Sequence, residues 1–142
     1  MSSLCRRPVV ILGAAACVLA LGSLTFAAGT DVPFSARQAE RGHQLYLARC
    51  ALCHGANLEG VSAPSLVGDD LATPDTPSIG DVFTTIVHRM PKSNPGTLAP
   101  SDATDIEAFL LSSNGFASGA HDLTAEAAAA SGVPYLRHTQ AP

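Results

Sequence analysis

The amino-acid sequence predicts an all-α domain of three to four helices joined by long loops. Three segments, 35–49, 78–89 and 101–113, carry apolar residues at the spacing of one helix face, and each begins at a serine that can cap a helix. The stretches between them are rich in Gly, Pro, Ser and Asp, and no run of alternating apolar and polar residues indicates a strand. A chain of 142 residues with this pattern is expected to form one domain.

The first predicted helix, 35–49, is interrupted by Gly42. A glycine inside a helix costs about 1 kcal/mol relative to alanine, so a second helix crossing closely at this point is the expected reason. The alternative is that the helix tolerates a glycine here without any packing reason. The apolar residues that indicate this helix are Ala39, Leu45, Tyr46 and Ala48.

The second and third predicted helices have their own boundary signals. Ser78 and Asp81 have the spacing of a capping box, and Pro91 ends the helix that they begin. Ser101 is expected to cap the third helix, which Asn114 and Gly115 would stop. Its predicted buried stripe is Ile106, Phe109 and Leu110, and an Ala-rich turn follows at 125–130.

The most specific motif is Cys50-Ala-Leu-Cys53-His54, which follows the first helix directly. The pattern C-x-x-C-H is typical of covalent attachment of a c-type haem, in which both thiols bond to the porphyrin and the histidine becomes an axial ligand of the iron. A thiol redox pair would be expected within a βαβ pattern, and a zinc site needs a second pair of ligands; neither is readable in the sequence. We therefore expect one haem c, held through Cys50 and Cys53.

Residues 1–28 have the features of a secretory signal peptide. Arg6 and Arg7 precede an apolar run at 9–21, and small residues follow at Ala27 and Ala28. We expect cleavage there, a haem domain at 29–116, a tail at 117–142 that packs on the domain or trails from it, and a periplasmic location. An uncleaved leader that anchors the protein to a membrane is the alternative.

Composition narrows the classes of function further. The formal net charge of −4 becomes −6 once the two leader arginines are removed, which argues against nucleic acid as a partner. Cys5 and Cys17 lie in the leader, so the mature chain has no thiol beyond the motif. With two Tyr, five Phe and no Trp, the core is poor in aromatic bulk, and a buried haem would fill it.

The second axial ligand decides between an electron carrier and an open iron. Met90 is the only methionine after Met1, and it stands between a predicted helix and Pro91 in a loop that can fold over a haem. A thioether opposite histidine favours the ferrous state. His88 is the strongest rival, and a core role for Met90 is the further alternative. The other histidines, expected at the surface, are His43, His121 and His138.

The segment from Gln38 to Gly115 resembles a class I monohaem cytochrome c of the small bacterial periplasmic kind. The likeness rests on Gly42, Tyr46, the Cys-His motif with Gly55, Pro64 with Leu66, Met90-Pro91, and the closing helix with Phe109, Leu110 and Leu111. It implies that the first and last helices cross at Gly42, that the Pro64 carbonyl holds the ring of His54, and that His54 and Met90 bind the iron. Ala63 stands where the family often has Gly.

The resemblance implies a protein that carries one electron and performs no bond chemistry on a substrate. Its partners would be redox proteins: a donor dehydrogenase, and an acceptor cytochrome or oxidase. The closing segment 110–116 is also similar to cytochrome domains that accept electrons from exported dehydrogenases with a quinone cofactor. Three alternatives to a free monomer carrier remain: a subunit of a redox complex, a membrane-anchored subunit of a larger oxidoreductase, and an open-site haem protein for a gas or peroxide.

Overall fold

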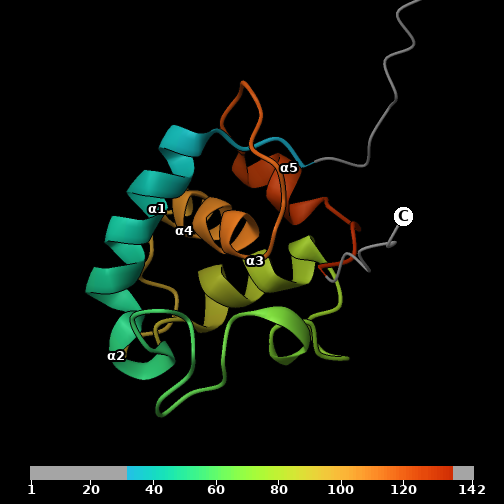
Figure 1. Cartoon of the computed structure of the whole chain (residues 1–142). Coiled ribbons are helices and arrows are strands. Elements are labelled where there is room, and N and C mark those ends of the chain that lie inside the picture. Colours follow the sequence, from blue (N-terminus) through green and yellow to red (C-terminus); the bar gives the residue numbers. More distant parts are fainter. Residues whose placement is uncertain (1–31, 136–142) are drawn as a thin grey trace, which may run out of the picture.

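A computed structural model describes residues 32–135 of the chain (Figure 1). The leader predicted at 1–28 and the end of the tail, 136–142, lie outside this described part. Within it the chain is helical, and only two isolated β-bridges interrupt the helices and loops. The helices are α1 (Ala36–Arg49), α2 (Ala51–His54), the short 3₁₀ turn η1 (Gly68–Asp70), α3 (Ile79–Arg89), α4 (Pro100–Ser113) and α5 (Ala125–Ala129). The predicted all-α class is confirmed.

The starts of α1 and α3 follow the predicted capping chemistry. The Ser35 side chain accepts a hydrogen bond from the backbone N–H of Gln38. Ser78 and Asp81 form the reciprocal capping box, each side chain accepting from the other's backbone N–H. Both helices therefore begin where local side-chain chemistry satisfies backbone groups that have no partner inside the helix.

The start of α4 differs from the prediction, which was wrong to place the cap at Ser101. Ala99 is the N-cap, and Pro100 is the first helical residue. Proline suits this position because its fixed φ is already helical and its missing N–H would have had no partner inside the helix. Ser101 lies within the first turn, and the helix ends as predicted at Asn114, followed by Gly115 at φ +83°.

Helices α1 and α4 cross at Gly42, as the sequence predicts (Figure 1). A Cβ added at Gly42 would lie 1.7 Å from the backbone oxygen of Asp105 and 3.0 Å from Cβ of Phe109. Beside this contact, Arg41 donates two hydrogen bonds to the Asp105 carboxylate, at 2.9 and 3.0 Å. The crossing sets the position of the C-terminal end of α1, where the Cys-His motif begins.

The segment after α4 returns along the domain and packs on it as far as Tyr135. Gln38, which is buried in α1, donates to the backbone oxygen of Leu123 at 3.0 Å and accepts from its N–H at 2.6 Å. Further along, Gly80 N–H donates to the Ser131 oxygen at 2.9 Å, at a point where a Cβ on Gly80 would clash. The segment thus covers the start of α3 and lies against α1.

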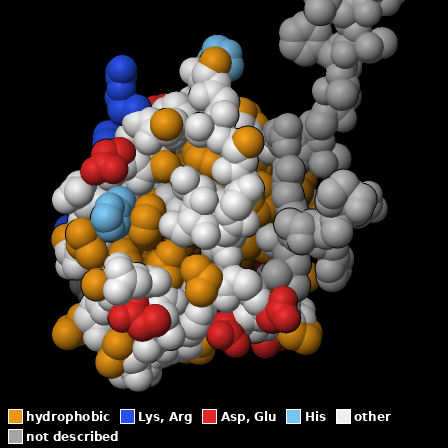
Figure 2. Space-filling model, viewed as in Figure 1, with side chains coloured by type: hydrophobic (Ala, Val, Ile, Leu, Met, Phe, Trp, Pro, Cys, Tyr) orange, Lys and Arg blue, Asp and Glu red, His pale blue; other side chains and the backbone are white. Residues whose placement is uncertain are grey.

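Figure 2 shows one face of the molecule, with Lys and Arg side chains and neighbouring acidic ones at the upper left and further acidic side chains along the lower edge. Four acidic residues lie exposed in the long loop between α2 and α3, namely Glu59, Asp69, Asp70 and Asp75. In the part of the chain that the structure describes, no helix is both long and apolar enough to cross a membrane.

Candidate haem-binding site

The Cys-His motif forms its own short helix, α2, at the end of α1. The N–H of Cys50 closes α1 on the Tyr46 oxygen, and the N–H groups of Cys53 and His54 then both donate to the Cys50 oxygen at 3.0 Å. Gly55 ends the turn at φ +82°, a conformation that favours glycine. The buried Tyr46 hydroxyl donates to the Gly55 oxygen. Burial raises the pKa of this hydroxyl to about 12, so it remains a donor at neutral pH.

The loop after the motif folds back against it through backbone hydrogen bonds. Three successive N–H groups, at residues 61, 62 and 63, converge on the Cys53 oxygen at 3.0–3.1 Å. The Gly60 N–H donates to the His54 oxygen at 2.7 Å. Ala63, where the resembling family often has Gly, takes part in this turn without a positive φ. These bonds fix the position of the next residue, Pro64.

The Pro64 carbonyl oxygen lies 2.8 Å from Nδ1 of His54, in the contact that the family resemblance implies. A carbonyl can only accept, so Nδ1 must carry the proton, and the neutral ring then has an unprotonated Nε2. The His54 side chain is 9% exposed. It is thus held in one orientation and one tautomer, with a nitrogen lone pair available to a metal.

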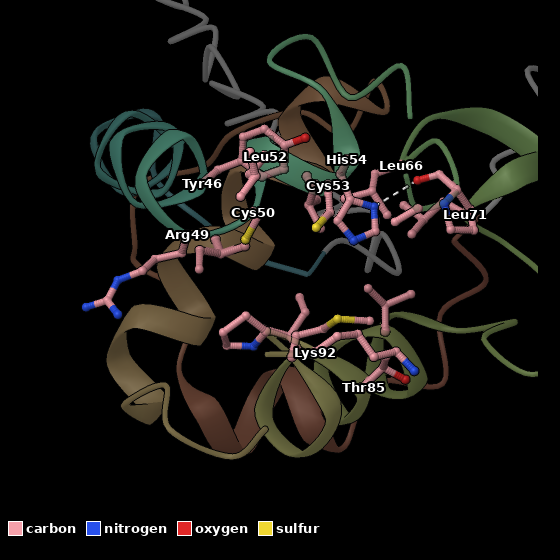
Figure 3. A pocket seen from close by; sticks show the side chains of 18 of the residues that line it. Tyr46, Arg49, Cys50, Leu52, Cys53, His54, Leu66, Leu71, Thr85 and Lys92 are labelled. Atoms are coloured by element: carbon pink, nitrogen blue, oxygen red, sulfur yellow. Dashed lines mark hydrogen bonds between the residues drawn. The ribbon is translucent and has the colours of Figure 1, made fainter. Parts of the chain in front are cut away.

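A cavity of about 370 Å³ opens beside this histidine. Figure 3 shows the sulfur atoms of Cys50 and Cys53 and the ring of His54 facing the same open space, with Leu66 and Leu71 beside the ring. All six residues singled out in the sequence line the cavity: Cys50, Cys53, His54, Pro64, Leu66 and Met90. Residues from α3, α4 and the long loop complete the walls, including Leu71, Val82, Ile86, Ile106 and Leu110.

Met90 reaches this cavity from the C-terminal end of α3, where it is the C-cap residue. The rival ligand, His88, is exposed and does not line the cavity. His43, which was expected at the surface, is half-buried and stacks on Phe109, with ring centroids 4.7 Å apart. His121 is exposed, and His138 lies outside the described residues. Binding of iron by Met90 stays a prediction.

The donor set and the walls fit a haem. The cavity is large, lined mainly by apolar side chains, and has two thiols on one wall beside an oriented imidazole. Burial, and then the neighbouring Cys53, raise the pKa of the Cys50 thiol to about 11. A thiol with a raised pKa is a poor nucleophile for disulfide exchange, which does not suit a redox pair. Between residues 32 and 135, no group of three or more His, Cys, Asp or Glu lies close enough to hold a metal ion.

Sequence reasoning missed several residues of the site. Tyr46 was expected only as a packing residue, and its hydroxyl in fact fixes the turn after His54. Arg49 and Lys92 also line the cavity, although Figure 3 shows Arg49 extending away from it. Helical periodicity indicated that Ile106 and Leu110 would be buried. Only the crossing of the helices shows which buried side chains face the cavity.

An all-α domain with a C-x-x-C-H motif on the wall of an apolar cavity is a c-type cytochrome domain, the class that carries electrons on a c-type haem. The chain belongs to the family described as cytochrome C oxidase, cbb3-type, subunit III, whose family model matches residues 37–110. No curated protein sequence matches the chain significantly.

Among solved structures, the chain is similar to that of the sulfane dehydrogenase SoxCD from Paracoccus pantotrophus. The two share 28% sequence identity with a TM-score of 0.50, over 83% of this chain and 65% of the other. The chain therefore spans a little under two thirds of the length of the chain that it matches.

Proposed function

We propose that the protein carries single electrons on one haem c, attached by thioether bonds to Cys50 and Cys53, with His54 and Met90 as axial ligands. One observation carries the proposal: a single apolar cavity gathers all four side chains, and the His54 ring is already fixed by the Pro64 carbonyl. Such a site needs no acid–base pair, because electron transfer breaks no bond of a substrate.

The residues of the chain have distinct tasks in this function. When bound, the haem supplies an iron that accepts and gives up one electron. His54 offers its unprotonated Nε2 because Nδ1 donates to Pro64. Met90, on the α3 side of the cavity, offers a thioether, which raises the reduction potential. Leu66, Ile106 and the other apolar walls exclude water and keep the surroundings of low dielectric constant.

We place the protein in the periplasm, cleaved after its leader, with an exported dehydrogenase as electron donor and a cytochrome or oxidase as acceptor. Two observations support redox partners: the family match and the likeness to a chain of a sulfane dehydrogenase. The same likeness favours a second candidate function, that of an electron-transferring subunit bound within a larger complex. N-terminal sequencing of the exported protein distinguishes a cleaved leader from a retained anchor.

Absorption spectra of the exported protein, oxidised and reduced, with and without carbon monoxide, test the axial ligands. We expect a low-spin haem that does not bind carbon monoxide. Met90→Ala should bind carbon monoxide. His88→Ala is the matched control, because it removes an exposed side chain that could bind iron and that lies two residues from Met90. It should leave the spectrum unchanged. A wild-type protein that binds carbon monoxide would instead be an open-site haem protein, and a protein without haem would contradict the proposal entirely.

A further inference from the structure

A carboxyl group lies inside the domain, away from the tasks described above. Glu107 on α4 is 0% exposed, and neither of its carboxyl oxygens makes a hydrogen bond within the described residues. A buried carboxylate without partners is strongly unfavourable, so the group holds its proton to a higher pH than an exposed glutamate does. A cytochrome core that needed only apolar filling would be more stable with leucine at this position.

The group facing this carboxyl is the hydroxyl of Tyr135, which is 2% exposed and comes from the C-terminal segment. The hydroxyl is close enough to lower the pKa of Glu107, yet no hydrogen bond of normal geometry joins the two groups. Burial is the larger effect and raises the pKa of Glu107 well above its usual value. Burial and the nearby carboxyl likewise raise the pKa of Tyr135.

The charged groups on the helices packed against α4 face elsewhere. On α1, Arg41 pairs with Asp105 and Asp122, and His43 stacks on Phe109. Tyr46 on α1 is also titratable and is buried against Phe109, and its hydroxyl donates to the Gly55 oxygen. The remaining charged or titratable residues of α1, α3 and α5 are all exposed: Arg37, Glu40, Arg49, Asp81, His88, Arg89 and Glu126. Each titratable side chain of α1, α3 and α5 is therefore either exposed or in contact with a group other than Glu107.

Glu107 belongs to a helix that forms part of the cavity wall. Helix α4 runs through the middle of the domain in Figure 1, and two of its residues, Ile106 and Leu110, line the cavity on either side of Glu107 in the sequence. Two charges on the order of 10 Å apart, at an effective dielectric constant near 20, change each other's binding equilibria roughly tenfold. Two cationic residues, Arg49 and Lys92, line the cavity itself, and neither makes a hydrogen bond to Glu107.

We propose that Glu107, beside Tyr135, is a proton-binding site coupled to the electron on the haem. The inference rests on the proposed function. When a redox partner delivers one electron, the Glu107 carboxylate binds one proton from water, and it releases that proton to water when the electron leaves. Charge is then conserved inside the core, because the added negative charge is matched by the proton.

The direction in which pH changes the reduction potential follows from the charges of the two redox states. The oxidised centre carries one more positive charge, which favours the Glu107 carboxylate, whereas the reduced centre favours the protonated acid. The pKa of the carboxyl is therefore lower in the oxidised protein than in the reduced protein. Between these two pKa values the reduction potential must fall as the pH rises. The largest possible effect is one proton bound per electron. The reduction potential then falls by about 59 mV per pH unit, which is a tenfold change in the equilibrium constant. The window lies above the pH range in which an exposed glutamate titrates.

The test is a redox titration of the haem-loaded protein at a series of pH values, for the wild type, Glu107→Gln and Glu126→Gln. Glu126→Gln is the matched control, because it removes an exposed carboxylate from α5. We expect the wild type and the control to show the same fall in potential above the usual glutamate range, and Glu107→Gln to lose it. Equal slopes in all three proteins would overturn the proposal.

Two further measurements keep the proposal testable if Glu107→Gln folds poorly. Tyr135→Phe removes the donor that lowers the pKa of Glu107, so the window should move to higher pH; an unmoved window would count against the pair. Reduced-minus-oxidised infrared spectra should show a protonated carboxyl band growing on reduction, and its absence would contradict the step. A protein that carries no haem would instead overturn the proposed function, and the absorption spectrum of each sample reports this directly.

Discussion

Replacing Gly42 by alanine should destabilise the domain more than any other glycine substitution in a helix. The new Cβ would lie 1.7 Å from the Asp105 oxygen and 2.4 Å from its carbonyl carbon. Both neighbours are backbone atoms, so no side-chain rotation relieves the clash, and α1 and α4 must separate by roughly half a van der Waals diameter. Overpacking usually costs 1–3 kcal/mol; with main chain on both sides we expect about 3 kcal/mol or more, even after the gain in helix propensity.

The assay is thermal and urea unfolding of the haem-loaded protein. For a domain of this size the loss corresponds to a fall in melting temperature on the order of 15 °C. Gly132→Ala is the matched control, because its Cβ would meet nothing within 4 Å and its φ is not positive. Gly80→Ala should fall between the two, since its Cβ would lie 2.8 Å from the Ser131 oxygen. Equal stability of the Gly42 and Gly132 variants would refute the close crossing.

Three more changes have expected outcomes. Tyr46→Phe leaves the Gly55 carbonyl without its buried donor and should lower the free energy of unfolding by about 1–3 kcal/mol, measured in urea; no change would mean that the bond is not formed in solution. Ser78→Ala removes half of the capping box on α3 and should cost about 1 kcal/mol in the same assay, whereas Ser113→Ala, at the C-terminal end of α4, should cost little because no cap is lost. Glu107→Gln should remove a dependence of stability on pH. Because the folded pKa of Glu107 is raised, its contribution is complete below the unfolded pKa of about 4.3 and is lost as the pH rises towards the folded value, by at most about 1.4 kcal/mol per pH unit. If Glu107→Gln lost as much stability with rising pH as the wild type does, another group would be responsible for that loss.

Local chemistry made much of this fold predictable. The caps at Ser35 and Ser78 depend on residues within three positions, so the sequence predicted both helix starts. The start of α4 was mispredicted because two local signals compete there, a capping serine at 101 and a proline at 100, and the proline determines the boundary. Gly42 was a correct clue to a crossing because its cost in a helix calls for compensation elsewhere.

The residues that local reasoning missed depend on contacts far apart in the chain. Glu107 occupies a helix position that the apolar pattern would leave at the surface, and only the returning segment with Tyr135 buries it. His43 was expected at the surface, and it is half-buried and stacks on Phe109 because α1 and α4 cross beside it. The motif residues were identifiable because the chemistry of haem attachment restricts their spacing. The other walls of the cavity have no such restriction.

The most direct test of the central claim is the mass of the intact exported protein after acid denaturation and extraction with organic solvent. The account predicts a chain heavier by one haem, and a variant carrying both Cys50→Ser and Cys53→Ser that retains none. The same mass measurement reports whether residues 1–28 have been removed. A wild-type chain at the mass of the polypeptide alone, with all haem in the solvent or none at all, would contradict covalent attachment at this site.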